Sequence, residues 1–252
     1  MYDAIVLAGG KSKEAGIGNG EYEALLNIGD RPMLYFVVDA LRKNEKIGDI
    51  FVVGAVEVLS KIQLSGKVNF VSSGLTIMDT VKNGIDAVGG KEKVLIVTAD
   101  LPFLTAEAID DFLLQCESSD RDFYYPIINK LCYEAKYPKG QRTYAKLTEG
   151  TFTGGNIFLL KPEIVETGIK VANEIVENRK KPWRLARQFG LLFLLQFVLG
   201  TLSLGKIEQR FFALTGIDGA VVHTDYAEIG MDVDKAADLR VANEYIQSLM
   251  IK

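Results

Sequence analysis

The strongest constraint on the fold is the alternation of short apolar runs with stretches of helical amphipathic spacing through the first 115 residues. The apolar runs are bounded by glycine or polar residues, which predicts buried strands at 2–8, 50–53, 68–71 and 94–97. The amphipathic stretches predict helices at 32–41, 77–88 and 106–115. Strands that alternate with helices favour a parallel sheet whose ligands bind beyond the carboxyl ends of the strands. We therefore expect the loops after Ala8, Val71 and Val97 to share one cleft.

The rest of the chain has a less regular pattern. Regularity weakens through 123–126 and the polar stretch 136–151, which we interpret as substrate-side structure or a lid. Strand character resumes at 155–160 and 220–223, a helix is predicted to begin at Pro162, and a closing helix is predicted at 235–249. With 252 residues and no repeat or low-complexity linker, the chain is predicted to form a single domain over 1–252, with a helical insertion at about 179–215.

Charge and cysteine usage narrow the partners and the compartment. A net charge of −4 provides no broad basic surface, so nucleic acid is not expected as a partner. Cys116 and Cys132 lack CxxC spacing and the start of the chain lacks a signal pattern, which favours a cytoplasmic protein whose cysteines only pack. A structural role is likewise expected for His223, the single histidine.

A double glycine follows the first predicted strand in the segment Leu7-Ala8-Gly9-Gly10. Glycine lets backbone amides approach phosphate closely, and consecutive N–H groups can form an anion-binding nest. The spacing matches neither the dinucleotide nor the Walker motif, so an ordinary tight turn is the alternative.

Two further segments place carboxylates where strands or extended turns end. Asp100 follows the apolar run 94–97, and Asp232 and Asp234 precede the closing helix. Mg²⁺, or Mn²⁺, is held by one or two carboxylates together with phosphate oxygens and water, so Asp100 and Asp234 are the predicted metal ligands. Helix capping is the alternative role for Asp234, and we rank Asp232 below it as a ligand.

In order and spacing, these motifs resemble the MobA-like nucleotidyltransferase family, which includes molybdenum-cofactor guanylyl- and cytidylyltransferases. The segments that carry the resemblance are 7–10, 24–34, 98–103, 154–156 and 232–234, so it spans almost the whole chain. The resemblance implies a Rossmann-like, GT-A-like fold of the nucleotide-diphospho-sugar transferases, a three-layer α/β sandwich with a mostly parallel sheet. It also implies that an acceptor phosphate attacks the α-phosphorus of a nucleoside triphosphate and releases pyrophosphate.

The resemblance assigns roles residue by residue. The nucleoside triphosphate and a small phosphorylated acceptor are the implied partners, and a divalent cation is implied at the aspartates. The triphosphate would lie along Leu7, Ala8, Gly9 and Gly10, the base near Ser73, Gly74 and Thr80, the metal at Asp100 and Asp234, and the acceptor near Asn156.

Two positions depart from the family pattern. Members usually carry an arginine four positions after the second glycine and a lysine just before the Ala-Leu-Leu segment, where this chain has Glu14 and Glu23. Lys11, Lys13 and Arg31 are the predicted replacements for the lost cations. The alternatives that stay open are a catalytically impaired nucleotide- or sugar-nucleotide-binding protein of the same fold and a related glycosyltransferase that uses the Asp-x-Asp at 232–234.

The segment 189–205 is unusually apolar and follows a basic run at 179–187. It is shorter than the roughly 20 residues of a membrane span and is interrupted by Gln196. We expect 189–204 to form a helix that is covered by the chain's own core or by a second copy in a homodimer. Contact with a membrane surface through the same residues is the alternative.

Overall fold

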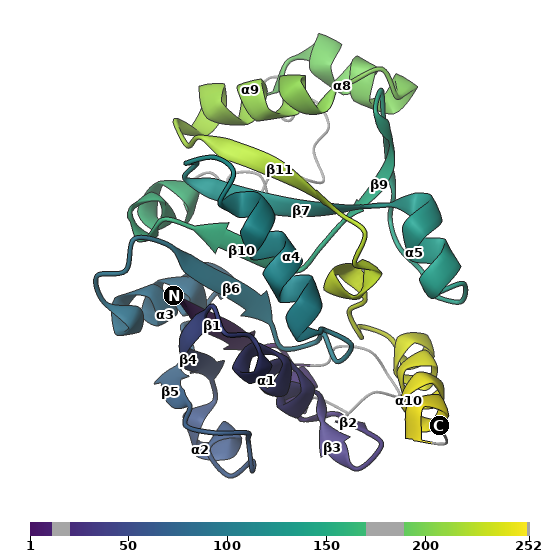
Figure 1. Cartoon of the computed structure of the whole chain (residues 1–252). Helices are drawn as coiled ribbons and strands as arrows, with labels where there is room; N and C mark the ends of the chain where they lie inside the picture. Colours follow the sequence, from purple (N-terminus) through teal and green to yellow (C-terminus); the bar gives the residue numbers. More distant parts are fainter. Residues whose placement is uncertain (12–20, 170–188, 251–252) are drawn as a thin grey trace.

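A nine-stranded sheet forms the centre of the molecule in the computed structural model, which describes residues 1–11, 21–169 and 189–250 (Figure 1). The strand order is β5-β4-β1-β6-β10-β7-β9-β8, and β11 pairs with β7. A separate hairpin consists of β2 (Asn27–Ile28) and β3 (Arg31–Pro32). The sheet strands are β1 (Tyr2–Ala8), β4 (Ile47–Gly54), β5 (Asn69–Ser72), β6 (Val94–Thr98), β7 (Phe123–Asn129), β8 (Ala145–Leu147), β9 (Gly150–Gly154), β10 (Ile157–Leu160) and β11 (Gly219–Thr224).

Helices connect most of these strands. The α-helices are α1 (Met33–Lys43), α2 (Val56–Leu59), α3 (Ile77–Val88), α4 (Ala106–Cys116), α5 (Lys130–Lys136), α8 (Leu191–Leu199), α9 (Leu204–Thr215) and α10 (Ala236–Met250). Short 3-10 helices are η2 (Glu23–Leu25), η3 (Pro162–Ile164) and η4 (Ala227–Gly230). The strands and helices predicted for the first 115 residues are all present, with bounds that differ by a few residues at most.

The sheet is covered by helices on both faces, which confirms the predicted three-layer α/β sandwich. Side chains alternate along β1, so Ala4 and Val6 pack with α1 and α4, whereas Ile5 packs with α3 on the opposite face. The parallel pairs β1–β4, β1–β6 and β4–β5 form one half of the sheet. In the other half β10 and β9 run opposite to the remaining strands, so most strands share one direction.

The segment 123–126, which the sequence left irregular, is the beginning of the long strand β7 despite Pro126. Along one edge β7 pairs with β10 through Phe123 and Tyr124 and then with β9 from Ile127 onward. Pro126 lies between these two stretches, where its carbonyl accepts a bond of 2.9 Å from the amide of Gly155. Its missing N–H therefore interrupts neither of the two antiparallel ladders, which explains how a proline fits inside the sheet.

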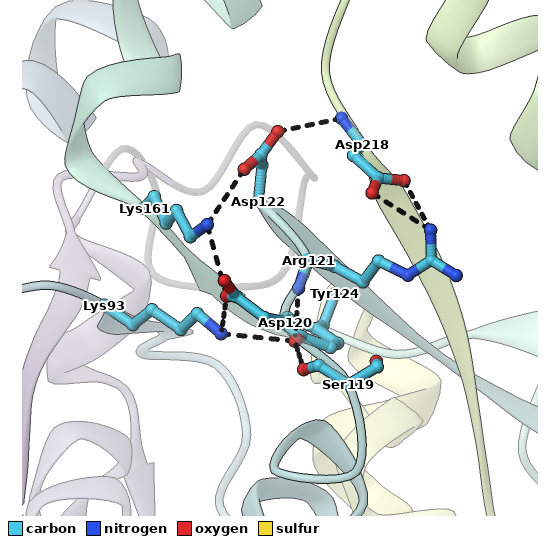
Figure 2. A network of polar contacts seen from close by, with 8 residues as sticks. All are labelled: Lys93, Ser119, Asp120, Arg121, Asp122, Tyr124, Lys161 and Asp218. Carbon is cyan, nitrogen blue, oxygen red and sulfur yellow. Dashed lines mark hydrogen bonds and ion pairs between the residues drawn. The ribbon is translucent and has the colours of Figure 1, made fainter.

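A polar network links four strands on the side of the sheet where β6, β7 and β11 begin and β10 ends (Figure 2). Asp120 pairs with Lys93 at 3.0 Å and with Lys161 at 3.2 Å, and Lys161 also pairs with Asp122 at 3.2 Å. Asp122 accepts a bond of 3.0 Å from the amide of Asp218 just before β11. These contacts join the starts of β6, β7 and β11 to the end of β10. β1 and β6 end on the opposite side of the sheet from this network.

The apolar segment differs from its prediction in two ways. Its helix, α8, ends at Leu199 because Gly200 adopts a left-handed conformation with φ of 68°, and α9 begins only at Leu204. No residue of α8 is buried, so the expected cover by the chain's own core is wrong. The first part of the predicted insertion, 179–188, lies outside the described residues. Within the described part of the chain, no helix is long and apolar enough to cross a membrane.

Gly84 allows α3 to approach the sheet closely, and enlarging it is expected to destabilise the fold. A Cβ added there would lie 2.8 Å from Cγ2 of Ile5 and 3.1 Å from Cγ2 of Val53. Overpacking of this kind costs about 1–3 kcal/mol. We expect Gly84→Val to lower the urea midpoint accordingly, whereas Ala87→Val on the exposed side of the same helix should change stability by less than about 0.5 kcal/mol. Equal stabilities of the two variants would contradict this packing.

Candidate functional site

A cavity of about 670 Å³ opens at the carboxyl ends of β1, β5 and β6. The predicted common cleft of the three loops is thereby confirmed. The cavity also receives residues from η2 and from the segment before α10, which are far from these loops in sequence. Its lining consists of Leu7, Ala8, Gly9, Gly10, Lys11, Glu23, Ala24, Ser73, Gly74, Leu75, Thr76, Ile77, Thr80, Thr98, Ala99, Asp100, Asp234 and Lys235.

The double-glycine loop is closely flanked on two sides. A Cβ added to Gly9 would lie 3.3 Å from Cβ of Ser73, and one added to Gly10 would lie 2.6 Å from Oε2 of Glu23. The Glu23 amide donates a 3.0 Å bond to the Gly10 carbonyl, which fixes η2 beside the loop. A side chain at either glycine would crowd these neighbours, and the Glu23 carboxylate lies at the loop, as the family resemblance predicted.

The residues predicted to hold the base form a compact turn at the start of α3. Thr80 Oγ1 accepts a 3.1 Å bond from the amide of Gly74 and donates a 2.9 Å bond to the carbonyl of Thr76. Thr76 and Asp79 form a capping box at the first turn of the helix. Ser73 is held at the end of β5 by a 3.0 Å bond from its amide to the Gly54 carbonyl. All three predicted residues, Ser73, Gly74 and Thr80, line the cavity.

Three aspartates meet at one wall of the cavity. Asp100, Asp232 and Asp234 each offer a carboxylate oxygen, and these oxygens lie within 4.8 Å of one another. The amide of Val233 donates a 3.0 Å bond to the carbonyl of Asp100, which links the end of β6 to the segment before α10. The predicted proximity of Asp100 and Asp234 is confirmed, and Asp232 joins them although the sequence ranked it lower.

Burial and mutual repulsion make this cluster reluctant to ionise. The pKa of Asp100 is raised to about 7, first by burial and then by the charges of Asp232 and Asp234, although Thr98 Oγ1 donates a bond to it. Burial also raises the pKa of Asp234 to about 6, with Asp232 and Glu23 adding to the rise. Carboxyls with raised pKa values set the electrostatic condition that a bound cation relieves.

A second, more polar cavity of about 370 Å³ lies on the other side of the aspartates. Asn156, predicted on the acceptor side, lines it and is fixed by bonds from the Thr98 amide to its carbonyl, at 3.2 Å, and from its amide to the Ile229 carbonyl, at 2.9 Å. Asp234 and Lys235 line both cavities, so the two spaces meet at this point.

Arg142 is a candidate site residue that the sequence did not identify. It lines the second cavity, forms an ion pair with Asp232, and donates bonds to Thr153 Oγ1 at 3.2 Å and to the Gly154 carbonyl at 2.8 Å. The only available signal was a cation within the polar stretch 136–151, which was assigned to the substrate side as a whole. Lys235 was also missed, although it directly follows Asp234 in the sequence.

The three cations predicted to replace the family's basic residues have different positions. Lys11 lines the first cavity, with its Nζ 5.1 Å from the centre of the Tyr22 ring. Arg31 lies in β3 with its guanidinium 4.1 Å from the centre of the Tyr35 ring, and it lines neither cavity. Lys13 lies outside the described residues, as does Glu14.

The residues expected to have only structural roles lie away from both cavities. Cys116 is buried at the end of α4, and burial raises its thiol pKa to about 12. Cys132 donates a 2.9 Å bond to the Asp225 carbonyl. The His223 ring stands at right angles to Phe152 with the ring centres 5.2 Å apart.

Comparison with known proteins places this arrangement in context. A family model described as the MobA-like NTP transferase domain matches residues 4–153. A hypothetical transferase from Thermus thermophilus has a TM-score of 0.80 and 34% identity, covering 94% of this chain and 99% of that one. A 4-diphosphocytidyl-2C-methyl-D-erythritol synthase from Anaerococcus prevotii has a TM-score of 0.62 over 98% of this chain and 96% of that one, and at 15% identity it shares the fold alone.

Curated relatives match a shorter region. The 2-C-methyl-D-erythritol 4-phosphate cytidylyltransferase of Bacillus cereus (strain ATCC 14579) is 28% identical over 126 residues, which cover 46% of this chain and 54% of that protein. The protein of the same name from Clostridium botulinum (strain Loch Maree) is 32% identical over 115 residues, covering 42% of this chain and 49% of that protein. The chain spans about half the length of the curated relatives it matches.

The raised pKa of Asp100 predicts how stability depends on pH. The unfolded chain ionises this carboxyl near pH 4, whereas the folded chain retains the proton up to about pH 7. The folded state therefore binds more protons between these values, and the cost of the buried charge is complete only above pH 7. Without divalent ions, Asp100→Asn should raise the melting temperature more at pH 8 than at pH 5, by about 2–4 °C for each kcal/mol relieved.

The exposed Asp225 provides the matched control for this measurement. Asp225→Asn should give the same small change in melting temperature at both pH values. A gain from Asp100→Asn that is independent of pH would contradict the assignment of a carboxyl that keeps its proton up to about pH 7.

Proposed function

The chain belongs to the MobA-like NTP transferase domain family, and we propose that it transfers a nucleoside monophosphate from a nucleoside triphosphate to a small phosphorylated acceptor. The observation that carries this proposal is the cluster Asp100, Asp232 and Asp234 at the junction of two cavities. A reaction between two bound anions needs both to reach one point where their charge is neutralised. The two cavities meet at the aspartates, and each offers a different chemical lining.

The first cavity suits the nucleoside triphosphate. Its volume of about 670 Å³ lies within the usual range for small-molecule sites. Gly9 and Gly10 leave the backbone open to phosphate oxygens, and Ser73, Gly74 and Thr80 form the opposite wall for the base. In this placement the α-phosphorus would lie near Asp100 and Asp234, next to the second cavity.

The second cavity suits the acceptor because its lining is polar and includes cations. Arg142 can present its guanidinium to a phosphate, a geometry that favours bidentate bonds. Asn156 and Thr153 offer neutral bonding groups for hydroxyls. The named activity of the curated relatives makes 2-C-methyl-D-erythritol 4-phosphate, and phosphorylated sugar derivatives more generally, the acceptor class to test first.

A divalent cation fits the cluster. Three carboxylate oxygens lie within 4.8 Å of one another, and the pKa values of Asp100 and Asp234 are raised, which suits a site of hard oxygen ligands for a divalent cation. Asp100 and Asp234 would hold Mg²⁺ or Mn²⁺, with Asp232 available when Arg142 turns to the acceptor. When bound, such an ion neutralises charge on phosphate oxygens during the displacement.

The chain's own residues would position the reactants. A phosphate oxygen of the acceptor forms the new bond to the α-phosphorus, while the bond from that phosphorus to the bridging oxygen breaks and its electrons leave with pyrophosphate. Lys11 lies beside the glycine loop and Lys235 lies between the cavities, so both can face the negative charge of this transfer. Lys13 and Arg31 stay further candidates for the same task, from the sequence alone.

A nucleotide-binding protein without transferase activity is the second candidate function. One observation favours it: the carboxylate of Glu23 lines the triphosphate cavity at the position where relatives of this family usually carry lysine. A carboxylate there repels the polyphosphate and weakens the stabilisation of the transition state. The third alternative, a glycosyltransferase, rests only on the Asp-x-Asp spacing at 232–234.

A pyrophosphate-release screen distinguishes the first two functions. The four common triphosphates, with CTP first, are combined with 2-C-methyl-D-erythritol 4-phosphate and a panel of other phosphorylated sugars in the presence of Mg²⁺ or Mn²⁺. We expect release that requires an acceptor and falls at least about 100-fold in Asp234→Asn, while Asp225→Asn keeps full activity. If the chain binds a triphosphate but no pyrophosphate is released with any of the acceptors, the result would instead support a nucleotide-binding protein without transferase activity.

The position of Glu23 predicts that reversing its charge strengthens triphosphate binding. At about 6 Å and an effective dielectric near 20, one like-charge pair costs roughly 2–3 kcal/mol before screening. Glu23→Lys should therefore lower the Kd for a Mg²⁺–triphosphate complex at least several-fold in calorimetric titration. Glu21→Lys, an exposed control two residues earlier that does not line the cavity, should change it much less. Weaker binding by Glu23→Lys would contradict the placement of the phosphates.

A further inference from the structure

The outward side of α8 presents a continuous apolar surface to solvent. We define the α8 face by its exposed aliphatic residues Leu191, Leu192, Leu195, Val198 and Leu199, whose exposed fractions are 65, 70, 49, 80 and 69%. At 3.6 residues per turn these side chains fall within an arc of about 120°. A stripe of this width normally packs against an apolar partner. No charged residue occurs anywhere in the helix.

The α8 face is held in place by the rest of the fold. On the inner side of the helix, the partly buried Phe193 packs against the cluster formed by Ile127, Leu147, Phe152 and Leu202. The chain after the helix is fixed by a 3.0 Å bond from the Thr148 amide to the Leu202 carbonyl. Figure 1 shows α8 and α9 at the end of the molecule farthest from β5 and α2. The apolar side chains therefore project from a fixed, outlying element.

The sequence that contains α8 has a local excess of positive charge. Residues 178–207 contain six arginine or lysine residues and no aspartate or glutamate, although the whole chain has a net charge of −4. Among the described residues, two cations lie next to the helix: the aliphatic stem of Lys146 packs on Gly200, and Lys206 Nζ lies 3.5 Å from Oε1 of Gln196. One acidic side chain, Glu149, accepts a 3.0 Å bond from the Leu204 amide at the start of α9. A partner of the α8 face is therefore expected to combine an apolar layer with negative charge.

A second copy of the chain does not satisfy these requirements. A nine-residue helix is about 14 Å long and about 10 Å wide. Its outer side is far smaller than the roughly 800 Å² that each partner buries in a stable interface. Two copies joined through this face would also bring together two segments of the same positive charge, which opposes association.

We propose that the α8 face docks on the surface of an anionic lipid bilayer. The leucine and valine side chains enter the boundary between headgroups and acyl chains, and Lys146 and Lys206 beside them contact the anionic headgroups. The helix lies in the plane of this boundary, because its nine residues are too few to cross the hydrocarbon core. This inference does not depend on the proposed transferase activity.

Flotation of the full chain with vesicles tests the proposal. We expect binding to vesicles of phosphatidylglycerol and phosphatidylcholine, and at least about tenfold weaker binding to phosphatidylcholine alone. The double variant Leu192→Glu/Val198→Glu should lose at least about tenfold in partition to the anionic vesicles. Leu114→Glu/Leu131→Glu changes two exposed leucines in α4 and α5, away from the α8 face, and should bind as the unchanged chain does.

Three outcomes would overturn the proposal. The first is a folded chain, judged by circular dichroism, that fails to bind anionic vesicles. The second is equal binding by the unchanged chain and by Leu192→Glu/Val198→Glu. The third is a dimer in light scattering that the same double variant converts to a monomer, since a second copy would then cover the α8 face. The double variant is compared with the unchanged chain in thermal melting, so that unfolding is not taken for lost docking.

Discussion

The parallel pairing of β1 with both β4 and β6 is the constraint on which the candidate site depends. Ala8 is paired with Gly54 and Leu7 with Thr98, so the strands leave the sheet at nearly the same level. The glycine loop, the turn before α3 and Asp100 are brought together by this register. Backbone hydrogen bonds within the sheet thus fix the cavity before any ligand is present. The polar network at the opposite ends of the strands (Figure 2) holds β7, β10 and β11 to β6.

The aspartate cluster is an unfavourable arrangement that other contacts sustain. Burial and like charge raise the pKa of Asp100 and Asp234, which means that ionising them in the folded state costs free energy. The bond between Val233 and Asp100 and the ion pair of Asp232 with Arg142 hold the cluster together. Stability given up at such a point is typical of sites whose ligand supplies the missing charge.

The candidate site and the sequence around α8 carry opposite local excesses of charge. The candidate site gathers carboxylates, including Glu23, beside the two cations Lys11 and Lys235. The segment 178–207 carries an excess of positive charge instead. The modest net charge of the whole chain conceals this separation, because opposite excesses cancel in the sum while each acts locally within about a Debye length.

The sequence by itself determined the strands and helices of the first 115 residues, the glycine loop and the positions of Asp100 and Asp234, because periodicity and motif spacing are local properties of the chain. It did not determine that Arg142 pairs with Asp232, since the two are 90 residues apart and only folding brings them together. Nor did it determine that α8 is exposed. An apolar run favours burial away from water, but only the tertiary structure decides whether other parts of the chain pack against it.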